Sequence, residues 1–349
     1  MDRPAPRRPL YPSEPRPVTS PLQIELSQRF LEPALPALVA YFLAVRLSLD
    51  PIMEARQPSK LGKPYPLGQC LEIARAAEHA VRDRSQPHFD GLAGEGRRAY
   101  VNYMAAGGVF RRVWGDLRGK FFQNAFQLGT LYVDVSNDTV TPTKPKVEIL
   151  PFAEAGLNAI RDFGHFREIV QLYWGGRTYP NHLLPELAPY CPVIHINEFG
   201  IASVREPTDY MVAMTRGDRF ASAQAILAEP AMPEPLFRLL AAGLAAQNCA
   251  PAASIEAGRR AGIEKCRKYR AKRWYANETI SLKWIAEATR LKPIQTGAPK
   301  AQPHDARVME LKASLQATDQ EIAELEARLA IARTARAAYA RSALDLLAS

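Results

Sequence analysis

The sequence has few cysteines, and they lie too far apart to form a familiar site. Its 349 residues include only Cys70, Cys191, Cys249 and Cys266, and no two of these form a Cys-x-x-Cys pair. This spacing argues against both a zinc site and a disulfide scaffold, and reduced thiols are typical of proteins inside the cell. We therefore expect buried thiols without a chemical role.

Long hydrophobic runs and a secretory leader are also missing from the N-terminal part. The longest uncharged apolar run there lies between Glu32 and Arg46 and has 13 residues, too few to span a bilayer. Residues 1–20 hold four Arg and six Pro, without the apolar segment that a secretory signal needs. The sequence therefore predicts a cytoplasmic protein whose residues 1–20 form a disordered arm.

The motifs of several common enzyme classes are absent. There is no Gly-x-Ser-x-Gly elbow in the chain. The glycines Gly91, Gly94 and Gly96 neither follow a predicted strand nor precede a Lys-Ser/Thr pair, so they do not match a phosphate-binding loop. The motifs therefore specify neither a cofactor nor a reaction.

Two aspartates and three histidines are the candidates for metal chemistry in the first 250 residues. Asp134 and Asp138 end a predicted strand, where carboxylates can hold a divalent ion against a phosphate-containing substrate. The alternative is that Asn137 and Asp138 cap the turn before the proline-containing loop. The histidines lack ligand spacing, so only the fold could bring together His165, His182 and His195, with Glu198.

Periodicity predicts an α+β fold, with a helix-dominated body and a small antiparallel sheet. A Ser20-Pro21 pair marks the start of the first helix, and proline punctuation over 51–66 indicates a loop. Apolar residues at steps of three to four predict a core helix over 109–126 and another over 153–174. Alternation predicts strands near 131–135 and 147–149.

The segment after residue 190 carries clearer local signals. Two short apolar runs, 193–196 and 201–204, are separated by four turn residues, which predicts a hairpin. Alanine-rich stretches predict helices over 209–228 and 234–247. We therefore expect one globular body over residues 21–250.

The net charge of +9 is unevenly distributed along the chain. Residues 21–250 hold 23 basic and 23 acidic side chains, whereas residues 251–349 hold 18 basic and 11 acidic ones. Because net charge bears on partners more than on fold, an anionic partner is expected to bind after residue 250.

A short basic stretch with aromatic residues concentrates this excess. Eight of the fifteen residues between Arg259 and Arg273 are basic, and Glu264 is the one acid among them. Cations neutralise phosphates and aromatic faces stack on bases, so the composition favours nucleic acid. An anionic membrane, an acidic protein or a solvated helix face are the alternatives. The candidate nucleic-acid-binding residues are Arg259, Arg260, Lys265, Arg267, Lys268, Arg270, Lys272, Arg273, Tyr269 and Trp274.

An amphipathic helix follows, with Asn277 as its expected cap. The segment Ser281-Leu-Lys-Trp-Ile-Ala-Glu287 resembles the leading helix of small helix-turn-helix tails on some transposase-like and DNA-associated bacterial proteins. The resemblance covers residues 277–291 and implies a second helix in the major groove of DNA. Two prolines and a glycine over 292–299 depart from that pattern, because they disfavour a helix.

A heptad pattern occupies the end of the chain. Residues 293–303 form a predicted linker, and residues 304–349 place apolar or aromatic side chains at nine of twelve a and d positions. This pattern predicts a coiled-coil helix or an amphipathic helix docked on its own body. A parallel dimer would oppose Glu321 to Glu326 and Arg328 to Arg333, so we expect an antiparallel self-pair, a heterotypic partner or an intramolecular hairpin.

Three functions fit these observations. The first is a non-enzymatic binding and assembly protein that contacts nucleic acid or another polyanion through a basic helical segment, residues 251–292, and a partner through the C-terminal helix. The second is a metal-assisted transferase acting on a phosphate-containing, nucleotide-sugar-like substrate. The third is a structural scaffold or adaptor. The charge pattern favours the first.

Overall fold

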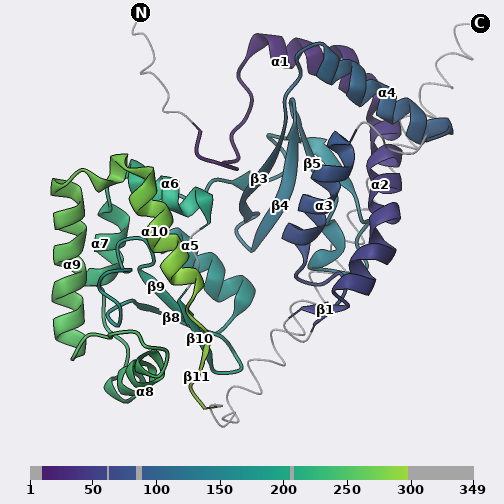
Figure 1. The fold of residues 1–349 in the computed structure, drawn as a ribbon. Coiled ribbons are helices and arrows are strands. Elements are labelled where there is room, and N and C mark those ends of the chain that lie inside the picture. Colours follow the sequence, from purple (N-terminus) through teal and green to yellow (C-terminus); the bar gives the residue numbers. More distant parts are fainter. Residues whose placement is uncertain (1–9, 61–62, 84–88, 205–207, 298–349) are drawn as a thin grey trace, which may run out of the picture. The chain divides into compact units, whose positions relative to one another are not determined.

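The computed structural model describes residues 10–60, 63–83, 89–204 and 208–297 (Figure 1). Helices account for 50% of these described residues and strands for 16%, which confirms a mixed α+β composition. Residues 293–297 of the predicted linker are described, whereas residues 298–303 and the predicted coiled coil, residues 304–349, lie outside the described residues. The described residues form three antiparallel sheets, of two, four and five strands.

The first helix begins where the Ser20-Pro21 pair places it, with the proline at the first helical position. The chain stays helical through Pro33 and Pro51, so the loop expected from residue 51 begins only after Arg56. Two later helices and a short ribbon complete this part. The elements are α1 (Pro21–Leu26), η1 (Ser27–Leu31), η2 (Glu32–Ala34), α2 (Leu35–Arg56), β1 (Ser59–Lys60), β2 (Lys63–Pro64), α3 (Cys70–Arg82) and α4 (Gly91–Ala105).

Within the described residues, one helical stretch is long and apolar enough to cross a membrane by length and composition. It covers Pro21–Arg56, and 39% of its most apolar window is buried inside the protein. Core helices of soluble proteins pass the same test. Here Leu38, Tyr41 and Phe42 pack into a hydrophobic cluster with α3 and the sheet, and Arg46 of the same helix is fully buried.

The largest sheet has the strand order β6-β5-β4-β3-β7. This arrangement shows that the helix predicted over 109–126 is wrong, because two strands pair there from Phe110↔Leu128 to Leu117↔Phe121. It is also larger than the small sheet expected. The strands are β3 (Phe110–Leu117), β4 (Phe121–Leu128), β5 (Leu131–Asp134), β6 (Glu148–Pro151) and β7 (Leu157–Asn158).

Two glycines explain why this segment forms a hairpin. Arg118 and Gly119 both have positive φ, 58° and 71°, and reverse the chain between β3 and β4. A Cβ on Gly115 would overlap the carbonyl oxygen of Asn158, so glycine is needed for β7 to pair with β3. The strands expected near 131–135 and 147–149 are confirmed as β5 and β6.

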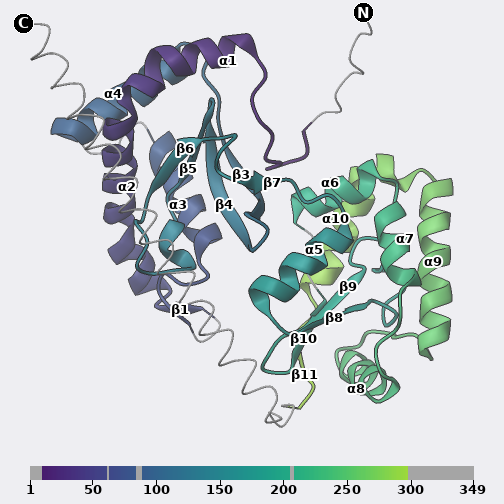
Figure 2. The same cartoon turned by 180° about the vertical axis from the view of Figure 1, so that it is seen from behind.

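The second half of the described chain is built on a sheet of order β11-β10-β9-β8 (Figure 2). The predicted hairpin is confirmed: β9 pairs with β10 around the turn at 197–200. β11 adds a short strand at the edge, inside the predicted linker. The strands are β8 (Arg177–Pro180), β9 (Val193–Ile196), β10 (Ile201–Val204) and β11 (Ile294–Gln295).

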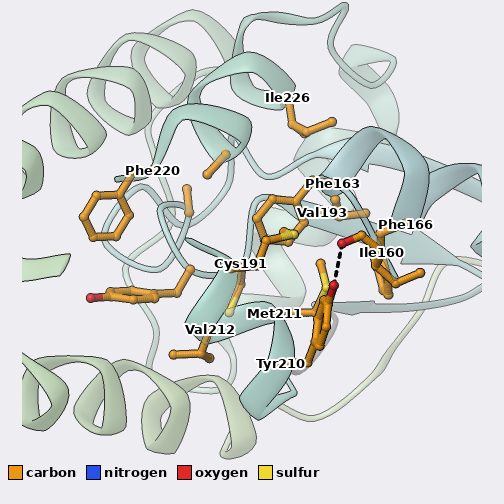
Figure 3. Packing of buried hydrophobic residues seen from close by; sticks show 14 of the residues in the cluster. Ile160, Phe163, Phe166, Cys191, Val193, Tyr210, Met211, Val212, Phe220 and Ile226 are labelled. Carbon is orange, nitrogen blue, oxygen red and sulfur yellow. Dashed lines mark hydrogen bonds between the residues drawn. The ribbon is translucent and has the colours of Figure 1, made fainter. Parts of the chain in front are cut away.

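The helices of this half surround a shared hydrophobic core (Figure 3). The helix expected over 153–174 begins only at Phe163, because Asp162 caps it there. The alanine-rich helices are confirmed, although Arg219 and Phe220, both left-handed, divide the first of them. Tyr210 is buried and donates a hydrogen bond to the carbonyl of Ile160, 2.7 Å (Figure 3). The helices are α5 (Phe163–Ile169), η4 (Val170–Trp174), α6 (Asp209–Gly217), α7 (Ala221–Ala228) and α8 (Glu234–Ala245).

The disordered arm predicted over residues 1–20 is wrong for residues 10–20, which contact other parts of the chain, and residues 1–9 lie outside the described residues. The carbonyl of Ser13 accepts a hydrogen bond from the Trp114 amide, 2.7 Å, and that of Arg16 accepts one from the Gln127 side chain, 2.8 Å. The ring of Tyr11 packs edge-on against Tyr210, 5.7 Å between centroids. These contacts hold residues 10–20 against the rest of the protein. A prediction from composition does not include the stabilisation that such tertiary contacts give.

Candidate nucleic-acid interface

Residues 259–271 of the basic stretch lie in helix α9 (Ile255–Ala271), and Lys272 and Arg273 follow it. Ser254 caps the helix, since its side chain accepts a hydrogen bond from the Ala257 amide, 3.2 Å. One stripe of α9 is small or apolar and packs inward: Gly258, Gly262, Cys266 and Tyr269 are buried. A Cβ on Gly258 would overlap the carbonyl oxygen of His182, so the helix backbone lies directly against that segment. The helix is therefore rigidly docked, and its opposite side faces solvent.

Among the described residues, three of the eight basic side chains form hydrogen bonds or an ion pair, and Lys272 contacts the ring of Trp274. Lys265 forms an ion pair with Glu186. Arg259 donates to the carbonyl of Glu229, 3.0 Å, and Arg270 donates to the carbonyl of Arg219, 3.0 Å. Only the first of these three partners is a carboxylate, so two of the three cations keep their charge uncompensated.

The other five basic residues are exposed and form what we call the basic face: Arg260, Arg267, Lys268, Lys272 and Arg273. Among the residues that the structure describes, no carboxylate pairs with any of them. Glu264, also exposed, is the one acid between them on the helix. In the described part of the chain, acidic side chains therefore do not neutralise the basic face, and it stays positively charged.

The two aromatic candidates differ in accessibility. Tyr269 is 1% exposed, and its hydroxyl donates to the carbonyl of Glu186, 3.2 Å, so no base can stack on its ring. Burial raises the pKa of Tyr269, and the phenol stays neutral. Trp274 is half-buried, with its ring 4.3 Å from that of Tyr269. Tyr269 therefore anchors α9, and Trp274 keeps part of its surface open.

The turn after α9 brings in residues from another part of the chain. Arg273 has a positive φ of 52° and ends the helix ahead of η5 (Trp274–Ala276). Arg216 donates to the carbonyl of Tyr275, 2.8 Å, and the guanidinium of Arg219 lies 5.3 Å from the centroid of the Tyr275 ring. Sequence reasoning missed both arginines, because nothing near residues 216–219 indicates that they meet this turn.

The metal candidates Asp134 and Asp138 are occupied by protein groups. Asp134 is fully buried and accepts hydrogen bonds from Gln123, Tyr132 and Ser136, at 2.6 to 3.0 Å. Burial raises its pKa to about 6, and these hydrogen bonds limit the rise.

Asp138 forms a two-armed ion pair with Arg46, at 2.7 and 3.0 Å. Lys146 adds a third contact, at 3.3 Å. Asp138 lies in a short 3-10 turn, η3 (Asn137–Thr139), but no side chain caps this turn, and the Asn137 side chain donates to the carbonyl of Pro145, 3.0 Å. The capping interpretation is therefore wrong for Asp138, whose carboxylate pairs with Arg46 and Lys146. Both carboxylates therefore act as structural groups in this arrangement.

The histidine candidates do not converge. Nε2 of each histidine donates a hydrogen bond to a different part of the protein. His165 donates to the Asp116 carboxylate, 3.2 Å. His182 donates to the carbonyl of Leu227, 2.9 Å, and His195 donates to the carbonyl of Gly175, 2.8 Å. Across residues 10–60, 63–83, 89–204 and 208–297, no group of three or more His, Cys, Asp or Glu side chains gathers to hold a metal ion.

The helix with the helix-turn-helix resemblance is α10 (Glu278–Thr289), and the Asn277 side chain caps it by accepting from the Ile280 amide, 3.2 Å. Residues 294–295 then pair with β10 as strand β11, so the described residues after α10 hold a strand where the resemblance implies a second helix.

Comparison with known proteins adds no further guide. No family model matches the chain, and neither a curated protein nor a solved structure matches it. The chemistry of the basic face therefore has to be argued from its own residues.

Proposed function

We propose that this chain is a non-enzymatic binding and assembly protein that contacts the phosphates of a nucleic acid through the basic face. The observation that carries the proposal is the exposure of five cations without a carboxylate partner in the described part of the chain. Lysine and arginine side chains of this kind neutralise phosphates and release counterions. Docking of α9 through its glycine stripe supports the proposal, because a helix that is already packed on the protein does not have to be ordered when the ligand binds.

The binding test uses the full-length chain and fluorescently labelled DNA and RNA strands at about 50 mM salt. We expect binding of both, and a loss of affinity on the order of 100-fold when Arg260, Arg267 and Lys268 are replaced together by glutamine. The matched control replaces Arg29, Arg56 and Arg75, which are also exposed, and changes net charge equally. No binding of DNA or RNA at low salt ends the proposal.

We further propose that residues 304–349 supply the assembly function by pairing with a second helix in antiparallel or heterotypic fashion. The heptad pattern and the opposed like charges at 321 and 326 support this orientation. Cysteine scanning of the full chain tests it, in a Cys249→Ser background because Cys249 is the most exposed native thiol. Equally efficient 311–311, 325–325 and 339–339 disulfides would instead mean a parallel pair.

A further inference from the structure

The turn after α9 lies against the turn between α6 and α7, and backbone carbonyls join the two. The side chain of Arg216 donates to the carbonyl of Tyr275, 2.8 Å. In the opposite direction, the side chain of Arg270 donates to the carbonyl of Arg219, 3.0 Å. These two bonds use the backbone carbonyls of Tyr275 and Arg219 and not their side chains.

Two half-buried rings at this junction each carry a cation. The Arg219 guanidinium lies 5.3 Å from the centroid of Tyr275, and the Lys272 ammonium lies 5.4 Å from that of Trp274. Both cationic side chains are exposed. Contacts between exposed cations and rings are weak in water, so a ligand that offers a phosphate and a flat ring can replace them.

Asp218, which precedes Arg219 in the chain, does not neutralise the cations of the junction. Asp218 accepts hydrogen bonds from the amides of Ala221 and Ser222, at 3.2 and 2.9 Å, and so caps α7. Within the described ranges no carboxylate forms an ion pair with Arg219, Lys272 or Arg273. The junction therefore combines net positive charge with two partly open aromatic rings.

We propose that this junction, formed by Arg219, Lys272, Arg273, Trp274 and Tyr275, binds the unpaired nucleotides of a single-stranded nucleic acid. The inference rests on the proposed function and names its substrate class. Single-strand binding combines cations that follow the backbone with aromatic faces on which bases stack. A duplex keeps its base faces stacked inside, so it can use the cations but not the rings.

The residues after α10 agree with this class of ligand. Duplex readers of the helix-turn-helix type insert a second helix into the major groove. The described residues that follow α10 instead contribute β11, which pairs with β10 at Ile201 and Ala202. A duplex could therefore use only the positive charges of the junction, whereas a single strand could use the charges and the two rings.

The test compares three labelled probes with the full-length chain at about 50 mM salt: a single strand of about 15 nucleotides, an abasic strand of equal length, and the matching duplex. We expect the single strand to bind about tenfold more tightly than the abasic strand, because only the former can stack. We also expect it to bind at least as tightly as the duplex. This comparison needs no variant and so does not depend on a variant that folds.

A ring deletion then locates the effect. Tyr275→Leu keeps an apolar side chain and the net charge, and we expect it to reduce affinity for the single strand about fivefold without changing that for the abasic strand. Phe199→Leu removes a ring that is 67% exposed in the β9–β10 turn and serves as the control.

The possible failures are distinguishable. Equal affinity for the single strand and the abasic strand, or tighter binding of the duplex, overturns the inference while the proposed function stands. Equal loss of affinity for both strands in Tyr275→Leu also overturns it, because a stacking role requires a base. Absence of binding to all three probes ends the proposed function itself.

Discussion

Substituting the two glycines on the inward side of α9 should change stability in opposite directions. In Gly258→Ala the new Cβ would overlap the carbonyl oxygen of His182, whereas nonbonded heavy atoms attract at roughly 3.5 Å. The new Cβ is held in place by the backbone of α9, and the carbonyl of His182 is itself backbone, so no side-chain rotation relieves the overlap. In Gly262→Ala the nearest atom is the end of the Leu227 side chain, at 3.3 Å, which can move by a few tenths of an ångström.

The magnitudes follow from two competing effects. Alanine gains about 1 kcal/mol of helix propensity over glycine at both positions. Overpacking a close contact costs about 1 to 3 kcal/mol, at the upper end when backbone must move. We therefore expect Gly258→Ala to lower the free energy of unfolding by about 2 kcal/mol and Gly262→Ala to raise it by about 0.5 kcal/mol.

Urea denaturation followed by circular dichroism measures both free energies in the same protein. The two substitutions are chemically identical and lie four residues apart on one helix, so each controls for the other. If Gly258→Ala is as stable as Gly262→Ala, then α9 does not rest against the carbonyl of His182. The rigid docking of the basic face would then be wrong.

Two further predictions concern buried charged or titratable groups. Arg46→Met leaves the buried Asp138 without its two-armed partner and should lower the free energy of unfolding by about 3 to 5 kcal/mol. Arg238→Met, which removes an exposed ion pair with Glu234, is the control and should cost less than about 1 kcal/mol. Equal losses of stability in urea denaturation would contradict this. Burial lowers the pKa of His182 below its usual value near 6.5, and the charge of Arg259 lowers it further. Below about pH 6.5 the unfolded chain therefore binds a proton that the folded protein does not bind, and the free energy of unfolding should fall as the pH falls. His182→Gln, measured from pH 7.5 to 5, should lose less stability over this range than the wild type, and an identical pH profile would refute the assignment.

Local sequence signals predicted many of the elements. The Ser20-Pro21 pair fixes the start of α1, and the β9–β10 hairpin follows from two short apolar runs and a four-residue turn. Asn277 caps α10 as expected. In each case the decisive residues are neighbours in the chain, so tertiary contacts were not needed.

The β3–β4 hairpin could not be found in this way. Its apolar residues recur at steps of three to four, which is also the helical period, and the role of Gly115 depends on β7, about forty residues later. Strand β5 shows a related limit. Its alternation predicted the strand but not its burial: Tyr132, Val133 and Asp134 are all fully buried, and Val133 and Tyr132 belong to different hydrophobic clusters.

The candidate interface was predictable in composition but not in detail. Counting charges located the stretch 259–273, but it could not separate Lys265, paired with Glu186, from Arg260, Arg267 and Lys268, which face solvent. Charge counting also could not exclude Tyr269 from the set of stacking residues, because its burial depends on contacts with residues far away in sequence, such as Glu186. The contribution of Arg219 required the fold itself, because the α6–α7 turn meets the α9 turn only in three dimensions.

The salt dependence of binding tests the basic face most directly. For a single strand, the logarithm of the affinity falls with the logarithm of the salt concentration, with a slope of about −0.7 per phosphate contact. Replacing Arg260, Arg267 and Lys268 by glutamine should therefore make the slope shallower by about 2, and the Arg29, Arg56 and Arg75 control should leave it unchanged. An unchanged slope in the first variant, or an equal change in both, would contradict the assignment of phosphate contacts to α9.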